Sequence, residues 1–83
     1  MPHVLAMGGD IAAFTGGAAE FDVAASTVRS MIRELEARFP GLGDYVGRRM
    51  AIAIDGEIFQ DADGATTLGE SSEVCLIPKI GGG

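Results

Sequence analysis

The sequence has one cysteine, no tryptophan and no long apolar run. Cys75 has no partner for an internal disulfide, and no Cys or His residues are paired at the spacing of metal ligands. The apolar runs are far shorter than the roughly 18 residues of a membrane-spanning helix, and residues 1–3 lack the basic start of a signal peptide. These absences predict a cytoplasmic protein with no internal disulfide, no bound metal and no membrane partner.

Basic residues are also scarce. Six Lys and Arg side chains stand against twelve Asp and Glu side chains, which gives a net charge of −6 at pH 7. Such a charge repels the phosphates of nucleic acid and of anionic membranes, so nucleic acid is not an expected partner and a protein with a basic face is favoured. The 83 residues suffice for one small domain, and a hydrophobic share of 47% predicts a packed core.

Two short runs near the N-terminus have the pattern of β-strands. Residues 3–7 are apolar and are ended by two glycines, whereas residues 20–23 alternate polar and apolar side chains. They are expected to lie side by side as antiparallel strands. The segment 10–15 between them is too short to assign.

The clearest helix is predicted over residues 28–39. Ser26 or Thr27 can cap its N-terminus with a hydroxyl oxygen, and Glu34 and Arg38 form a favourable pair one turn apart. Its apolar side chains recur at helical spacing and form one stripe, which must pack against a flat surface. The stripe consists of Val28, Met31, Ile32, Leu35 and Phe39.

Three further strands are expected in the second half. Residues 50–54 and 57–59 flank an Asp-Gly turn and predict a hairpin, and the polar segment 60–72 has Leu68 as its one large apolar residue. The continuous apolar run 74–77 suits a strand buried on both faces in the middle of a sheet. The order β-β-α-β-β-β predicts a two-layer α+β domain, with one main helix on a four- or five-stranded sheet.

The chain ends in the bare sequence PKIGGG, residues 78–83, directly after the last predicted strand. Glycine allows close backbone approach and backbone angles that a Cβ would forbid. An extended chain spans at most about 3.3–3.6 Å per residue, so residues 79–83 could reach a site about 15 Å beyond the sheet. A projecting end of this kind suits insertion into a narrow channel of another protein.

Several stretches resemble the ubiquitin-like sulfur carriers of the MoaD/ThiS type, most of all the small subunit of molybdopterin synthase. The more specific similarity combines Gly69, Glu73-Val74 and Leu76-Ile77-Pro78 with the final glycines. The family typically closes with a stretch like Pro-Pro-Val-Ala-Gly-Gly, so Gly81 takes the place of the alanine and Lys79 that of the second proline. Weaker similarities lie in FTGG (14–17), STV (26–28), FPGL (39–42) and IDGE (54–57).

The resemblance implies a β-grasp domain over residues 1–80, with a mixed sheet, and a flexible glycine tail over residues 81–83. It implies that an E1-like adenylyltransferase uses ATP to adenylate the Gly83 carboxylate, and that a sulfur donor protein then converts it to a thiocarboxylate. The sulfur would pass to a larger synthase subunit or another accepting enzyme, in molybdopterin biosynthesis for the most similar relatives. The chain would bind no cofactor and would be no enzyme alone.

Other functions remain open. The same carrier chemistry could serve thiazole, cysteine or specialised-metabolite biosynthesis, and a ubiquitin-like modifier would instead join Gly83 to lysines of other proteins. A β-grasp interaction module with an idle tail is the fourth interpretation. In the carrier interpretation, partners grip Pro78, Lys79, Ile80, Gly81 and Gly82, and an apolar patch on the sheet that includes Phe59 or Ile80, with acidic residues around it, supplies affinity.

The remaining candidate residues have simpler explanations. Asp61, Asp63 and Glu70 fit part of a calcium-loop spacing, but a solvated acidic loop is favoured. Cys75 lies within an apolar strand and is expected to fill the core, the alternative being a sulfur-accepting thiol. His3 is expected at a strand edge or in solvent.

Arg48 and Arg49 directly precede the third predicted strand. They are expected in a solvated loop, with a contact to acidic residues of a partner as the alternative.

Overall fold

The computed structural model describes residues 1–8 and 10–79. Along the chain lie β1 (His3–Ala6), α1 (Ile11–Thr15), β2 (Glu20–Asp22), α2 (Val28–Arg38), α3 (Leu42–Arg49), β3 (Met50–Ile54), β4 (Glu57–Phe59) and β5 (Glu73–Pro78). The five strands form one sheet in the order β2-β1-β5-β3-β4. Within the described residues, no helix has the length and apolarity needed to cross a membrane.

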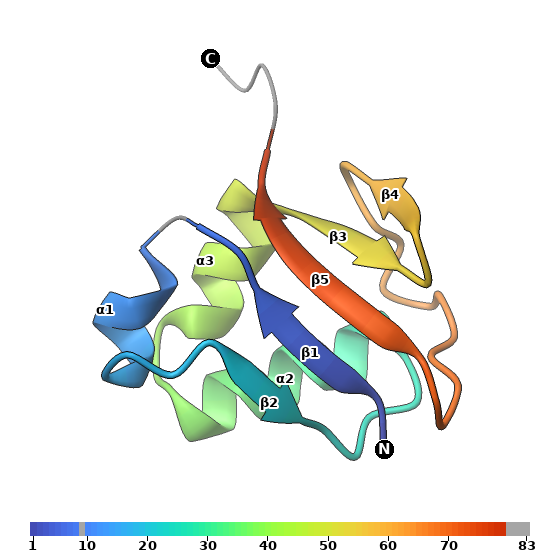
Figure 1. Ribbon diagram of the computed structural model, residues 1–83, viewed down its shortest axis with the longest axis horizontal. Coiled ribbons are helices and arrows are strands. Elements are labelled where there is room, and N and C mark those ends of the chain that lie inside the picture. Colours follow the sequence, from blue (N-terminus) through green and yellow to red (C-terminus); the bar gives the residue numbers. More distant parts are fainter. Residues whose placement is uncertain (9, 80–83) are drawn as a thin grey trace.

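The sheet and the helices form two layers, as predicted. Figure 1 shows α2 and α3 behind the sheet, while the other face of the sheet is turned to the viewer and carries no helix. Strand residues alternate between the two faces because successive side chains of a strand point in opposite directions. Those on the helix side form the buried core with the apolar stripes of α2 and α3, and they include Val4, Phe21, Met50, Ile52, Val74 and Leu76.

β5 occupies the centre of the sheet, as its apolar sequence predicts. It pairs in parallel with β1 and antiparallel with β3, and β1 pairs antiparallel with β2. The prediction that both faces of this strand are buried is wrong. Val74 and Leu76 are buried beneath the helices, whereas Cys75 and Ile77 on the open face are only half-buried, because no second layer covers them.

α2 begins where its capping residues predict. Thr27 is the N-cap: its side chain accepts a hydrogen bond from the Ser30 N–H, and the Ser30 side chain accepts one from the Thr27 N–H. This reciprocal pair satisfies two of the N–H groups that the first turn of a helix leaves without partners. The pair of Glu34 and Arg38 on the surface of this helix is also confirmed.

α3 is a helix of eight residues in a segment for which the sequence analysis predicts no helix. The prediction of a loop at Arg48 and Arg49 is therefore wrong, because both lie in the last turn of this helix. Its N-terminus is held by the Glu36 side chain of α2, which accepts hydrogen bonds from the N–H groups of Gly41 and Gly43 at 2.9 and 3.0 Å. A carboxylate at this position also complements the positive end of the helix dipole.

The Asp-Gly turn closes the predicted hairpin. Asp55 and Gly56 both have positive φ, 49° and 89°, and lie between the paired strands β3 and β4. Two central residues with φ > 0 match the right-handed twist of the flanking strands. Leu68 is buried, as expected for the one apolar anchor of the long segment that follows β4.

Candidate functional site

The candidate site lies where β5 leaves the sheet. The strand is held on both sides at this point, since the Met7 N–H donates to the Leu76 carbonyl at 2.8 Å and the Lys79 N–H donates to the Arg49 carbonyl at 3.0 Å. Pro78 lies opposite Met50 in the register of β3. The chain is therefore held from the β1 side as far as Leu76 and from the β3 side as far as Lys79, at the upper end of β5 in Figure 1.

Of the residues predicted at the end of the chain, Pro78 and Lys79 are described and those that follow are not. Pro78 is exposed, and Lys79 is half-buried with its Nζ 2.9 Å from an Asp61 carboxylate oxygen. Ile80, Gly81, Gly82 and Gly83 lie outside the described residues, and so does the predicted boundary between the domain and the tail.

The open face of the sheet carries a row of apolar side chains. By strand register, Leu5, Cys75, Ala53 and Ile58 lie next to one another across β1, β5, β3 and β4. Met7 and Ile58 are among the most exposed large hydrophobic residues, with 51% and 54% of their surface exposed. The apolar face consists of Leu5, Met7, Ala53, Ile58, Cys75 and Ile77; Ala51 lies opposite Ile77 but is buried.

Phe59 does not belong to the apolar face. Its partner in the register is Ile52, a core residue on the helix side of the sheet, and Phe59 itself is half-buried. The exposed apolar side chain of this hairpin is its neighbour Ile58, because adjacent residues of a strand point to opposite faces. A partner contact at Phe59 stays a prediction.

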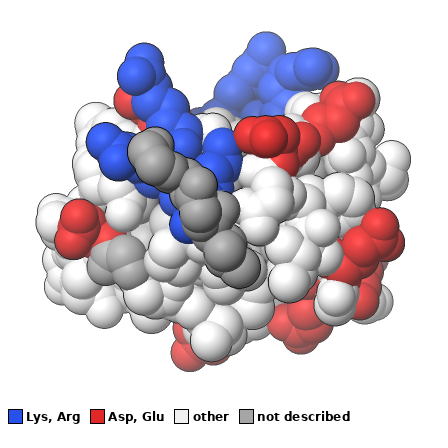
Figure 2. All heavy atoms as spheres, turned by 90° about the horizontal axis from the view of Figure 1, so that it is seen from above, with Lys and Arg blue, Asp and Glu red and all other residues white. Residues whose placement is uncertain are grey.

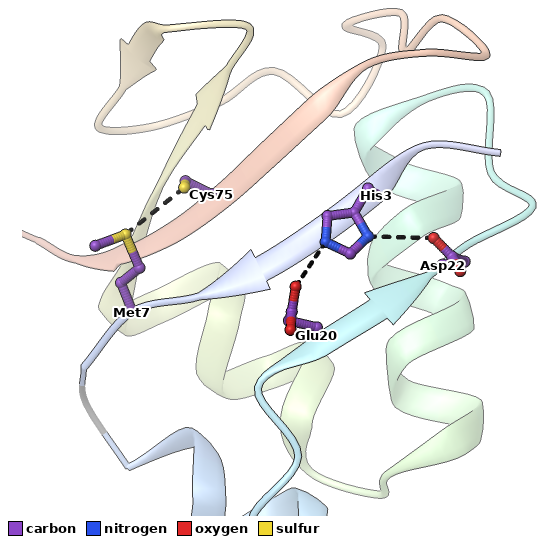
Figure 3. Close-up of polar contacts among 5 residues, drawn as sticks. All are labelled: His3, Met7, Glu20, Asp22 and Cys75. Carbon is purple, nitrogen blue, oxygen red and sulfur yellow. Dashed lines mark hydrogen bonds and ion pairs between the residues drawn. The ribbon is translucent and has the colours of Figure 1, made fainter.

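Cys75 lies at the centre of the apolar face and not within the core. Its Sγ is 3.7 Å from the Sδ of Met7, and both side chains appear together in Figure 3. Cys75 is half-buried there, because Met7 and the neighbouring strands cover part of it. The sequence signal for this face is that the apolar runs 4–7 and 74–77 are continuous, so that both sides of β1 and β5 carry apolar residues.

His3 lies at the other end of the open face, on an inner strand. Its Nε2 is 3.0 Å from Glu20 and its Nδ1 is 3.2 Å from Asp22, both on β2 (Figure 3). The hydrogen bond with Asp22, followed by that with Glu20, raises the pKa of His3 above 6.5. Only the imidazolium form donates from both ring nitrogens, so this arrangement favours the charged form. These acidic partners are distant from His3 in the sequence, and the pairing of β1 with β2 brings them close.

The acidic loop makes local contacts. Asp61 pairs with Lys79, and Asp63 accepts a hydrogen bond from the Ala65 N–H at 2.8 Å. Among the described residues, no group of three acidic, His or Cys side chains is arranged to hold a metal ion. The proximity of Asp61 to Lys79 links this loop to the end of β5.

Charged side chains are unevenly distributed over the molecule. Figure 2 looks onto the end from which β5 leaves the sheet, and Lys and Arg side chains gather in the upper half of this view. The acidic side chains lie mostly toward the margin. An overall acidic protein therefore has a basic region at this end.

The comparisons with known proteins agree with this geometry. Residues 9–83 match the model of the ThiS family. The chain belongs to the ThiS family. The relationship confirms the resemblance to the ubiquitin-like sulfur carriers, and the solved structures that are similar confirm the β-grasp fold. No curated protein sequence matches the chain closely.

Three similar structures span several biological settings. One chain of the Amycolatopsis orientalis BexX/CysO complex matches with 18% identity and a TM-score of 0.79, and the match covers 100% of this chain and 100% of that one. A complex of subunits 1 and 2 of the molybdopterin-converting factor from Helicobacter pylori matches with 22% identity and a TM-score of 0.66, covering 99% of this chain and 97% of that one. SAMP1 from Haloferax volcanii matches with 21% identity and a TM-score of 0.67, covering 99% and 98%.

Proposed function

We propose that this protein is a sulfur carrier whose C-terminal Gly83 becomes a thiocarboxylate in the cytoplasm. The observation that carries the proposal is the position of β5: the central strand of a ThiS-family domain ends at Pro78, five residues before Gly83. A hydrogen bond from Met7 holds it at Leu76, and a hydrogen bond to the Arg49 carbonyl holds it at Lys79, the last residue before position 80. This arrangement delivers the final residues, Ile80 to Gly83, to a partner.

The reaction belongs to the partner enzymes. A carboxylate is a poor acyl donor, so an E1-like adenylyltransferase first joins the Gly83 carboxylate to the α-phosphate of ATP and releases pyrophosphate. A sulfur donor protein then supplies sulfide-level sulfur, which attacks the acyl carbon; the new C–S bond replaces the C–O bond to AMP, AMP leaves, and Gly83 carries a thiocarboxylate. This splits one difficult step into two easier ones. The carrier itself provides a reactive end and a surface for recognition, and it is not an enzyme alone.

Affinity for these partners comes from the apolar face. Ordering the final residues costs on the order of 1–2 kcal/mol of backbone entropy per residue, so the folded domain must supply compensating contacts. Met7 and Ile77 lie beside the point where β5 ends, and Met7 is half-exposed. An apolar surface of the activating enzyme, continuous with its channel, therefore covers this face and receives the tail in one step.

The first hypothesis is that the carrier provides sulfur for molybdopterin biosynthesis. The Helicobacter pylori complex pairs a similar chain with subunit 2 of a molybdopterin-converting factor, which supports a larger synthase subunit as partner here. Service to another sulfur pathway is the second hypothesis, and the similarity to a chain of the BexX/CysO complex favours it. A protein-modifier role is supported by the similarity to small archaeal modifier proteins.

Intact-mass measurement tests the proposal. Incubation with an E1-like adenylyltransferase, ATP and a sulfur donor should add about 16 Da, the difference between sulfur and oxygen, if activated acyl transfer occurs. A variant that lacks Gly82 and Gly83 serves as the control and should keep its mass. An unchanged mass for the full chain would overturn the carrier proposal, and conjugates on other proteins would favour the modifier.

A further inference from the structure

The end of β5 is bordered by three basic residues that the fold brings together. Arg48 and Arg49 form the last turn of α3, and the Arg49 carbonyl accepts the hydrogen bond from the Lys79 N–H. The chain thus passes from α3 into β3 directly beside the last residue of β5. We call Arg48, Arg49 and Lys79 the basic rim; Figure 2 shows the basic side of this end.

The basic rim keeps unused capacity for carboxylates. Arg48 contacts Asp44 at 2.9 Å and Lys79 contacts Asp61 at 2.9 Å, but both acidic partners are largely exposed. Within residues 1–8 and 10–79, no carboxylate lies within ion-pair distance of Arg49. Exposed ion pairs are weak, so the Arg48 pair can be shared with or exchanged for an incoming carboxylate.

A purely structural role explains only part of this arrangement. Basic residues in the last turn of a helix interact favourably with the helix dipole, typically by a small amount at an exposed site. That interaction does not require the arginines to border the exit of another strand. Arg48 has 76% of its side chain exposed, and an exposed guanidinium can bind a carboxylate through two parallel hydrogen bonds.

We propose that the basic rim binds carboxylates of the activating enzyme at the mouth of the channel that receives the tail. This inference rests on the proposed function and adds that the partner surface around the channel is acidic. The apolar face lies on one side of the exit and Arg48 and Arg49 of α3 lie on the helix side, so the partner presents an apolar surface opposite acidic residues. Complementary charge of this kind mainly accelerates association and sets orientation.

The test compares two variants of equal net charge. Arg48→Gln with Arg49→Gln removes two positive charges and keeps long, helix-compatible side chains. Ser26→Glu with Ser71→Glu adds two negative charges; starting from −6, both variants have a net charge of −8. Ser26 and Ser71 are exposed near the start of β5, about 20 Å along the strand from Lys79 at about 3.3 Å per residue.

The measured quantity is the association rate with the E1-like adenylyltransferase that loads the wild-type chain in the mass assay, followed over a series of salt concentrations. The arginine variant should associate about tenfold more slowly at low salt, with rates that converge at high salt because ions screen the attraction. With the salt series starting at about 0.1 M, the control should stay within about twofold of the wild type, because its added charges lie about 20 Å from the rim and the screening length there is about 10 Å.

Each outcome separates the two proposals. An equal loss in both variants would assign the effect to net charge and overturn the basic rim, and so would a wild-type rate in the arginine variant. If either result is obtained while the wild-type chain still gains sulfur in the mass assay, the proposed carrier function stands. A wild-type chain that gains no sulfur overturns the carrier function itself. Thermal unfolding of both variants identifies any loss that comes from folding.

Discussion

Two glycines of α3 should respond in opposite ways to the same substitution. Gly43 and Gly47 lie one turn apart on this helix, and alanine is favoured over glycine inside a helix by about 1 kcal/mol. A Cβ at Gly47 would meet no atom within 4 Å, because the residue lines the open groove between α2 and α3. Gly47→Ala should therefore stabilise the protein by about 1 kcal/mol.

Gly43 has no such space. A Cβ there would lie 2.9 Å from the Glu36 Cβ and 3.0 Å from the Ile32 carbonyl oxygen. The backbone oxygen cannot move without α2, so the helices must separate, and overpacking of this kind typically costs about 1–3 kcal/mol. The separation also strains the hydrogen bonds from Gly41 and Gly43 to Glu36, each worth about 1 kcal/mol. These costs exceed the gain in helix propensity, so Gly43→Ala should destabilise the protein by about 1–3 kcal/mol.

Thermal and urea unfolding measure this contrast directly. For a domain of this size, 1 kcal/mol shifts Tm by about 4–8 °C, so Gly47→Ala should melt several degrees higher than the wild type and Gly43→Ala several degrees lower. Each variant is the matched control of the other, since the residue change and the helix are the same. Equal stability of the two variants would refute the argument that close packing of α2 and α3 selects glycine at position 43.

Three further outcomes follow from the structure. His3→Gln should lower Tm more at about pH 5.5 than at about pH 8.5. The hydrogen bonds to Asp22 and Glu20 raise the pKa of His3, so the stabilisation they give is complete below pH 6.5 and is lost as the pH rises through the folded-state pKa. A Tm difference that does not depend on pH would contradict this. Gly56→Ala should cost about 1–2 kcal/mol in urea unfolding, since φ of 89° disfavours a Cβ, and a neutral result would count against the turn geometry. Ile58→Asp should raise the KM for sulfur loading without lowering Tm, and an unchanged KM would exclude Ile58 from the docking surface.

The strands and the main helix could be predicted because their residues carry local signals. The stripe from Val28 and the Thr27 cap predict α2, and the Asp-Gly pair predicts the β3–β4 hairpin. The apolar run in β5 indicates its central position. Sequence patterns of this kind report burial on one face of an element, so they identify the core more readily than the surface.

The sequence does not predict α3 because two glycines and a length of only eight residues outweigh its short apolar stripe of Leu42, Tyr45 and Val46. Gly43 and Gly47 are poor helix formers, and Gly41 precedes the helix with a positive φ of 94°. What stabilises this helix is tertiary: its packing on α2 and the Glu36 carboxylate at its N-terminus. No window of local sequence contains that information, and the same reason hid the basic rim, whose arginines were assigned to a loop.

The ends of β5 also explain why net charge is a poor guide to the partner. Glu73 and Asp55 lie near its start, whereas Arg49 and Lys79 lie at its end. The strand separates them by about 20 Å, which exceeds the screening length of about 8 Å at physiological salt. Each end therefore interacts with its own surroundings. A composition of −6 favours a basic partner on average, but the proposed acidic channel mouth interacts mainly with the rim, because the acidic end of β5 lies beyond the screening length.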